Sequence, residues 1–134
     1  MIKFVVLGKP CSKGRPRFNR QGFTYKDEKT ANYENLIKLS FQSEFPEHKP
    51  FEGIVKANIQ AVFEIPKSYT KKKRMEIEKH NNLYPKKSDC DNIAKIILDS
   101  LNGIAYRDDS QVAILSVIKI YGNQAKVIVE LEEV

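Results

Sequence analysis

One stretch of the sequence alternates between apolar and polar residues and constrains the fold more than any other feature. From Val55 to Ile65 an apolar residue stands at every second position, and the positions between include Lys56, Asn58 and Gln60. Successive side chains of a β-strand point to opposite faces, so this period of two predicts a strand with one buried and one solvated face. Pro66 ends the stretch, because proline cannot continue a central strand.

Three other segments favour helices. A helix capped by Asp27 or Thr30 would carry apolar residues three and four positions apart and stop before Pro46. Residues 91–102 show the same periodicity, and Gly103 follows where a left-handed C-terminal cap belongs. Residues 70–80 also suit a helix but hold few apolar side chains, so we expect a short exposed one.

Further strands complete the expected sheet. Ile2–Leu7 is almost entirely apolar and reads as a buried strand, and residues 9–22 read as a basic loop with a short strand near 23–25. Two more strands, 111–121 and 125–132, are separated by a connection short enough for a hairpin. With 134 residues, no repeat and no linker, the chain is predicted to be a single α/β (α+β mixed) domain over residues 1–134. We expect a mixed β-sheet packed by two to three helices.

Composition excludes several classes of protein. No apolar run reaches the roughly 18 residues that a membrane span needs, and the N-terminus lacks the pattern of a signal peptide. We therefore expect a cytoplasmic protein without a membrane partner. Cys11 and Cys90 are far apart and lack ligands at zinc-finger spacing, so they are predicted to be reduced thiols. His48 and His80 stand alone in polar stretches, where a solvated surface position is expected.

The formal net charge of +6 is unevenly distributed. Residues 1–26 hold seven Lys or Arg and no acid, and residues 67–87 hold eight basic residues against two acids. The rest of the chain has a net charge of −7. Two basic blocks on an otherwise acidic protein are typical of a surface that binds a polyanion.

Two acidic pairs accompany these basic blocks. Asp89 and Asp91 stand at the expected start of the helix 91–102, and Lys95 follows Asp91 by one helical turn. One interpretation is structural: one acid caps the helix, and Asp91 and Lys95 form a solvated ion pair worth about 0.3–0.5 kcal/mol. Asp108 and Asp109 form the second pair, for which a polar turn is the corresponding structural interpretation.

Taken together, the two pairs favour a metal site. Carboxylates packed together repel one another unless a cation lies between them. Without His or Cys partners, oxygen ligands favour Mg²⁺ or Mn²⁺ over zinc. With basic blocks nearby, the expected substrate is a phosphodiester.

These residues resemble a known family. The sequence is similar to the RusA-type Holliday junction resolvases, and in particular to their Gram-positive and phage branch. In the acidic region the resemblance rests on Asp89, Cys90, Asp91, Asn92, Lys95, Asp99, Leu101, Asn102, Gly103, Asp108, Asp109, Gln111 and Val112. Near the N-terminus it rests on Gly8, Lys9, Pro10, Lys13, Arg15, Pro16, Arg17, Tyr25, Tyr33 and Glu34. Ser88 departs from the pattern, because many members have proline there.

The resemblance implies a small α/β homodimer that nicks four-way DNA junctions with Mg²⁺, or Mn²⁺ as a substitute, and no organic cofactor. Asp89, Asp91 and Asp109 would be the metal-binding and catalytic acids, with Asp108 ranked below them. Lys95 would be the essential basic catalytic residue, which either stabilises developing negative charge or positions the attacking water. Two cuts in one junction call for two identical sites, hence the dimer. Such a bacterial or phage-encoded enzyme would serve host or prophage recombination and repair.

The basic blocks would hold the DNA arms through phosphate contacts. The predicted DNA-binding residues are Lys9, Lys13, Arg15, Arg17, Arg20, Lys71, Lys72, Lys73, Arg74, Lys86 and Lys87. The interleaved aromatic residues Phe18, Phe23, Tyr25 and Tyr69 either stack on DNA or pack against the sheet, with packing the favoured alternative.

Two other functions remain open. A non-catalytic nucleic-acid-binding module would use the basic blocks alone, with the acids as caps and turns. A general Mg²⁺ nuclease would use the same acids on flaps or linear duplexes.

Overall fold

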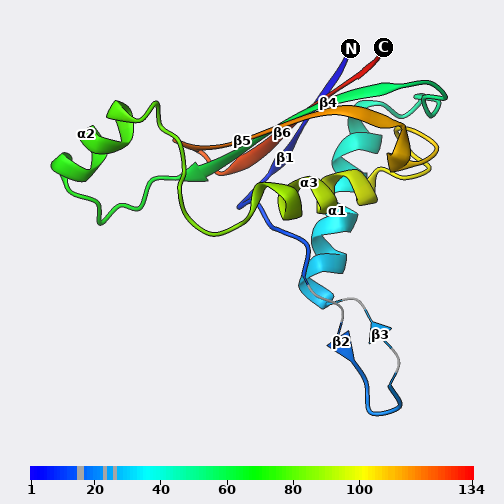
Figure 1. The fold of residues 1–134 in the computed structure, drawn as a ribbon, viewed down its shortest axis with the longest axis horizontal. Coiled ribbons are helices and arrows are strands. Elements are labelled where there is room, and N and C mark those ends of the chain that lie inside the picture. Colours follow the sequence, from blue (N-terminus) through cyan, green and yellow to red (C-terminus); the bar gives the residue numbers. More distant parts are fainter. Residues whose placement is uncertain (15–16, 23, 26) are drawn as a thin grey trace.

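A computed structural model describes residues 1–14, 17–22, 24–25 and 27–134. Its centre is a four-stranded sheet in the order β1-β6-β4-β5 (Figure 1). The strands are β1 (Ile2–Leu7), β4 (Val55–Glu64), β5 (Val112–Gly122) and β6 (Lys126–Glu133). β4 runs parallel to β5 and antiparallel to β6, which confirms a mixed α/β fold with a mixed sheet.

The described residues form three α-helices, and two of them build the core. α1 (Glu28–Glu44) begins after Asp27 at the N-cap, and α3 (Cys90–Ser100) is followed by Gly103 at a φ of +76°, as predicted. Both helices lie on the same face of the sheet (Figure 1). The core is formed by their apolar side chains and by the alternate residues of the strands, including Ile37, Phe41, Ile93, Ile96, Ile97, Ile59 and Val129.

Two segments extend away from this core (Figure 1). α2 (Lys71–Lys79) has no buried residue, and the Thr70 side chain caps it by accepting a hydrogen bond from the Lys73 N–H, which confirms a short exposed helix. β2 (Arg17–Phe18) and β3 (Thr24–Tyr25) form a two-stranded ribbon. Within the described residues, none of the helices could cross a membrane.

The predicted hairpin of the last two strands is wrong. β5 and β6 are not neighbours: they flank β4 on opposite sides, so the chain crosses the end of β4 between them. Gly122 lies at this crossing, where an added Cβ would be 2.5 Å from Cγ1 of Val62. The glycine therefore allows the chain to pass close to β4. A short connection that contains glycine does not by itself show that the two flanking strands pair with each other.

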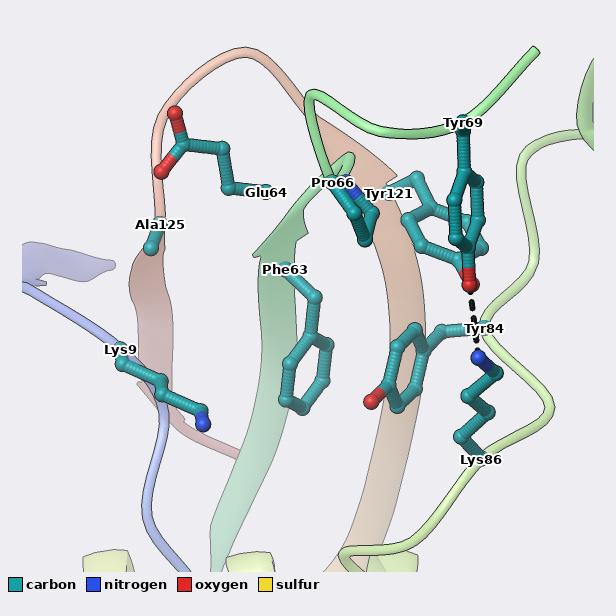
Figure 2. A pocket seen from close by; sticks show the side chains of 9 residues that line it. All are labelled: Lys9, Phe63, Glu64, Pro66, Tyr69, Tyr84, Lys86, Tyr121 and Ala125. Atoms are coloured by element: carbon teal, nitrogen blue, oxygen red, sulfur yellow. Dashed lines mark hydrogen bonds between the residues drawn. The ribbon is translucent and has the colours of Figure 1, made fainter. Parts of the chain in front are cut away.

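The connection between α2 and α3 returns along β5. Leu83 forms an isolated antiparallel bridge with Ile120, and the Tyr84 N–H donates to the Lys119 carbonyl. This path lays the Tyr84 ring flat on the Phe63 ring, with centroids 4.0 Å apart (Figure 2). The same segment thus covers the C-terminal half of the outer edge of β5.

His48 does not occupy the predicted solvated position. Its ring is half-buried and packs edge-on against Phe41 and Phe51, at centroid distances of 5.3 and 4.8 Å. Its Nε2 lies 3.0 Å from the Ala105 carbonyl oxygen. The residues next to His48 in sequence are polar, so the sequence did not indicate that its ring packs with aromatic side chains from other segments. His80 is exposed, and both cysteines are free, as expected.

Candidate active site

The first turn of α3 carries the first acidic pair. Asp89 is the N-cap residue, and its backbone carbonyl accepts a hydrogen bond from the Ile93 N–H, yet its side chain makes no cap hydrogen bond. Asp91 follows in the first turn, and both side chains are exposed. The interpretation of Asp89 as a helix cap therefore agrees with its position but does not explain its carboxylate, which makes no capping hydrogen bond.

The residue before this pair has an unusual backbone conformation. Ser88 adopts a φ of +89°, in the left-handed region that residues other than glycine rarely occupy. Proline fixes φ near about −65°, so a proline at this position would not fit this backbone. Strained conformations of this kind cluster at functional sites.

Further along α3, three charged residues follow one another at four-residue spacing. Asp91, Lys95 and Asp99 lie along one stripe of the helix, opposite its buried face. Among the described residues, Asp91 and Lys95 form no ion pair. The solvated ion pair of the structural interpretation is therefore not formed. Lys95 instead lies close enough to Asp99 for its charge to contribute to lowering the pKa of that carboxyl.

The loop after β1 delivers a lysine to this stripe. The Lys13 Nζ lies 2.8 Å from Oδ2 of Asp99 and 3.7 Å from Oε2 of Glu34, whose side chain is 6% exposed. The Lys13 N–H donates to the Asn92 carbonyl, and the Gly14 N–H donates to the Thr30 hydroxyl, so the loop is seated on both helices. Lys13 therefore has a local partner that the sequence did not indicate.

This contact shifts the titration of both partners. Burial acts to lower the pKa of Lys13, but its hydrogen bond to Asp99 and the nearby carboxylates outweigh burial and raise it. Burial acts to raise the pKa of Asp99, but the hydrogen bonds with Lys13 and Asp109 and the charges of Lys13 and Lys95 together outweigh burial and hold that pKa below its usual value. Both shifts favour the charged forms of the pair.

The second acidic pair divides into two different environments in the 3₁₀ helix η1 (Asp109–Gln111). The Asp108 carboxylate caps this turn by accepting a hydrogen bond from the Ser110 N–H at 3.0 Å. The Ser110 side chain and then this N–H lower the pKa of Asp108. Asp109 instead meets the Asp99 carboxyl. That hydrogen bond, followed by burial and the charge of Asp108, raises the pKa of Asp109. Of the two acids, Asp109 is the one that faces another carboxylate.

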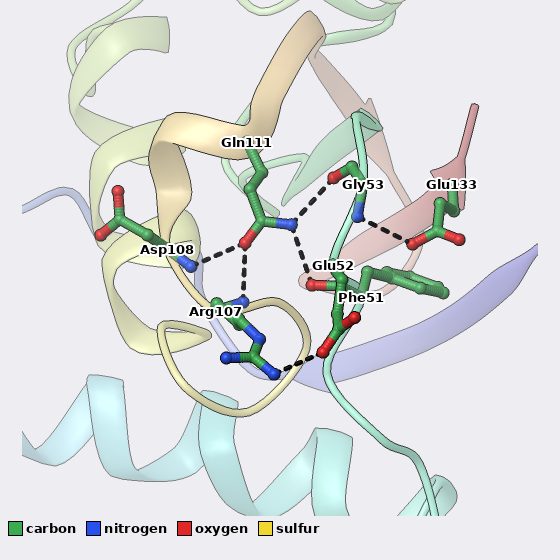
Figure 3. A network of polar contacts seen from close by, with 7 residues as sticks. All are labelled: Phe51, Glu52, Gly53, Arg107, Asp108, Gln111 and Glu133. Carbon is green, nitrogen blue, oxygen red and sulfur yellow. Dashed lines mark hydrogen bonds and ion pairs between the residues drawn. The ribbon is translucent and has the colours of Figure 1, made fainter.

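A glutamine fixes the turn that presents Asp109 (Figure 3). The Gln111 side-chain oxygen accepts hydrogen bonds from the N–H groups of Arg107 and Asp108, at 2.8 and 2.9 Å. Its amide nitrogen donates to the carbonyls of Phe51 and Gly53, each at 2.8 Å. Gln111 therefore ties the turn to the start of β4.

The donor chemistry of this site fits a hard cation, since all the candidate ligands are carboxylates. Asp109 ionises less readily beside Asp99, which is the behaviour expected of acids that a cation would separate. The described residues nevertheless contain no ready group of three or more His, Cys, Asp or Glu side chains that could hold a metal ion. Asp99 and Asp109 meet, whereas Asp89, Asp91 and Asp109 form no such group.

The predicted DNA-binding residues lie in separate places. Lys71, Lys72, Lys73 and Arg74 occupy the exposed α2, and Lys9, Arg20, Lys86 and Lys87 are exposed in loops. Arg15 and Phe23 lie outside the described residues, and for Arg17, Phe18 and Tyr25 only the backbone is described. Lys13 is engaged with Asp99 and Glu34, as stated above.

Comparison with known proteins assigns the chain to a family. The family model described as Endodeoxyribonuclease RusA matches residues 8–132, nearly the whole chain. The chain belongs to the RusA family. It is also 35% identical over 138 residues to the uncharacterized protein YqaN of Bacillus subtilis (strain 168), an alignment that covers 99% of this chain and 96% of that protein. Membership of the RusA family implies nuclease activity on Holliday junctions and binding of junction DNA, and nucleases of this family generally depend on divalent metal ions.

The structure gives contacts to Asp99, Glu34 and Gln111, which the family resemblance included without assigning them a role. Asp99 was detectable as a site residue from its spacing of four from Lys95 and eight from Asp91. Glu34 was named only through the family resemblance, and its contact with Lys13 had no signal in the sequence, because the two residues are distant along the chain. Gln111 had a weak signal, as the residue three positions after a capping aspartate.

Proposed function

We propose that this RusA-family chain is a Mg²⁺-dependent endodeoxyribonuclease that resolves Holliday junctions by paired symmetric nicks. The observation that carries the proposal is the family match over residues 8–132. It is supported by the Asp89 carboxylate, which stands at the start of α3 without a capping bond, and by the contact of Asp109 with Asp99.

Asp89, Asp91 and Asp109 would hold the ion, and the full ligand set would form only on binding. When bound, Mg²⁺ lowers the pKa of a water ligand and polarises the scissile phosphate. Lys95, exposed between Asp91 and Asp99, donates to the phosphate oxygen on which negative charge develops, or orients the attacking water. Asp108 stays with its cap. Lys13 helps to keep Asp99 ionised, and a cation bound at Asp109 would relieve the repulsion between these two carboxylates.

The proposal is tested with labelled DNA in three forms: a mobile four-way junction, a flap and a linear duplex. Wild type should cut only the junction and only with Mg²⁺, and Asp91→Asn should not cut. Glu28→Gln is the matched control, since both acids stand in the first turn of a helix. Equal cutting by Asp91→Asn would remove it from the site, and equal cutting of all three substrates would favour the general nuclease.

A second variant separates catalysis from binding. We expect Lys95→Ala to bind junctions with wild-type affinity and leave them uncut, as measured by gel shift and cleavage on the same DNA. Loss of binding with residual cutting would move Lys95 to the DNA-contact residues. Metal-independent binding without any cleavage by wild type would establish the non-catalytic module instead.

The proposed homodimer would pair through the β5 edge of the sheet. β5 and β1 are the two edge strands, and among the described residues no segment pairs with the outer side of β5 between Val112 and Ile118. These seven residues include no charge, although edge strands usually carry charges or proline that prevent pairing. Ile114 and Ile118 are exposed on one face of the strand and Leu115 on the other, at 49%, 43% and 46%.

Antiparallel pairing with a second β5 covers both apolar faces at once and places no like charges opposite each other. Sedimentation velocity should therefore show a dimer for wild type and a monomer for Ile118→Lys. Leu39→Lys changes an exposed apolar residue on α1 and should leave the dimer intact. A monomeric wild type, or a dimeric Ile118→Lys, would refute this surface.

A further inference from the structure

The two basic blocks of the sequence meet at an aromatic pocket that the proposed chemistry does not use. The pocket lies between the end of β4, the loop that leads to α2 and the segment that returns along β5 (Figure 2). Lys9 borders it from the first basic block, and Lys86 borders it from the second. Its volume is about 250 Å³.

Three aromatic rings form the inner wall. Phe63 and Tyr84 are stacked with an interplanar angle of 7°, and Tyr121 packs edge-on against Tyr84 at a centroid distance of 5.0 Å. Phe63 and Tyr121 are only 5% and 6% exposed, so they are buried and hold the half-buried Tyr84 in place. Tyr84 is therefore the ring of this wall that a flat group can reach.

The rim carries positive charge and a fourth ring. The Lys86 Nζ donates to the Tyr69 hydroxyl at 2.6 Å, and the Lys73 Nζ stands 4.5 Å from the centroid of the Tyr69 ring. In Figure 2, Lys9 and Lys86 stand on opposite sides of the opening, with Tyr69 and Pro66 above it. Among the described residues, Glu64 is the acid that lines the pocket.

Size and charge together define the ligand. Pockets for drug-sized molecules measure about 300–1,000 Å³, so this one admits a single flat group. An aromatic wall with a cationic rim suits a nucleobase attached to a phosphate, because every base has a face that stacks on aromatic rings. A continuous duplex does not supply this ligand, since its bases are stacked on one another, whereas an unpaired nucleotide does.

We propose that this pocket binds one unstacked nucleotide of a DNA strand. Its base lies against the aromatic residues of the pocket, and its flanking phosphates lie against Lys9 and Lys86. This inference rests on the proposed function, which makes DNA the polymer. To the proposed resolvase activity it adds a binding site for an unpaired nucleotide at the branch point of a junction.

The test uses the full chain without metal, so that cutting does not interfere. A labelled oligothymidylate of about eight nucleotides, within the site sizes of roughly 4–16 known for single-stranded binders, is compared by fluorescence anisotropy with an abasic strand of equal length. Wild type should prefer the thymine strand. Tyr69→Ala should weaken thymine binding about tenfold and leave abasic binding unchanged, because stacking needs a base.

Two variants and one competitor complete the design. Tyr69→Phe keeps the ring and should keep the preference for the thymine strand. Lys86→Ala should weaken the binding of both the thymine strand and the abasic strand. Lys49→Ala, which removes an exposed lysine outside the pocket, should weaken the binding of neither strand. Circular dichroism confirms that each variant is folded. Free thymidine monophosphate should compete poorly.

The inference is overturned if wild type binds both strands equally, if Tyr69→Ala weakens both equally, or if the mononucleotide competes as well as the oligonucleotide. These outcomes are separable from the main proposal. Junction cutting without preference for thymine defeats the pocket alone, and preference for thymine without junction cutting defeats the proposed resolvase alone.

Discussion

Replacing Asp109 by asparagine should stabilise the metal-free protein while abolishing its proposed activity. The Asp109 carboxyl faces that of Asp99 and feels the charge of Asp108, and its pKa is raised for these reasons together with burial. An acid whose pKa is raised on folding stabilises the folded state when it is protonated, at pH values below its pKa in the unfolded chain. This stabilisation is lost as the pH rises through the pKa of the group in the folded state. At pH 7 the ionised Asp109 therefore opposes folding, and an amide removes the repulsion.

The expected gain is about 1 kcal/mol at pH 7. Two unit charges about 4 Å apart interact by about 1 kcal/mol in water and about 4 kcal/mol near a protein surface, and the lower value applies because Asp109 is only partly buried. Urea unfolding at pH 7 without metal measures this gain, and repetition near pH 3 should abolish it. Added Mg²⁺ should stabilise wild type, since binding to the folded state alone favours it, but not Asp109→Asn.

The adjacent Asp108→Asn is the matched control. An asparagine caps a helix about as well as an aspartate, so its amide oxygen can accept from the Ser110 N–H. Because the pKa of Asp108 is lowered, its loss should give no stabilisation. The reasoning is refuted if Asp109→Asn destabilises the metal-free protein, or if Mg²⁺ stabilises that variant as much as wild type.

Three further substitutions test the surroundings of the site. Lys13→Met should lower the free energy of unfolding by about 1–3 kcal/mol in urea titrations, between the values for surface and buried pairs, because it removes the positive charge that lies beside the carboxylates of Asp99 and Glu34; no change in midpoint would contradict the pairing. Gly122→Ala should cost about 1–3 kcal/mol through its clash with Val62, and Val62→Ala in the same chain should recover part of the loss; strictly additive costs would argue against the clash. Gln111→Glu keeps the acceptor but loses both donated bonds, so it should lower the melting temperature and slow junction cutting; unchanged values would remove Gln111 from the support of Asp109.

Local patterns predicted the elements well. The alternation from Val55, the start of α1 after Asp27 and the left-handed Gly103 all depend on residues near one another in sequence, and each is found at its expected position. The Asp27 side chain, however, makes no capping hydrogen bond, and the C-cap residue of α3 is Leu101. The exposed α2 was equally predictable, because its sequence holds too few apolar residues to be buried.

Features that depend on distant segments were not predictable. Which strand pairs with β5 is decided by the crossing at the end of β4, so the short connection through Gly122 was misleading. The aromatic cage of His48 and the pairing of Lys13 with Asp99 likewise join residues far apart in the chain. Proximity of the two acidic pairs was expected, but the acid that meets Asp109 is Asp99, two turns after Asp91.

The central claim is paired resolution of a junction, and mapping the cuts on all four strands of a fixed junction tests it most directly. We predict Mg²⁺-dependent nicks at symmetric positions in two opposed strands, with 5′-phosphate and 3′-hydroxyl ends that DNA ligase can seal. Nicks scattered over all four strands, or ends that ligase cannot join, would contradict the account.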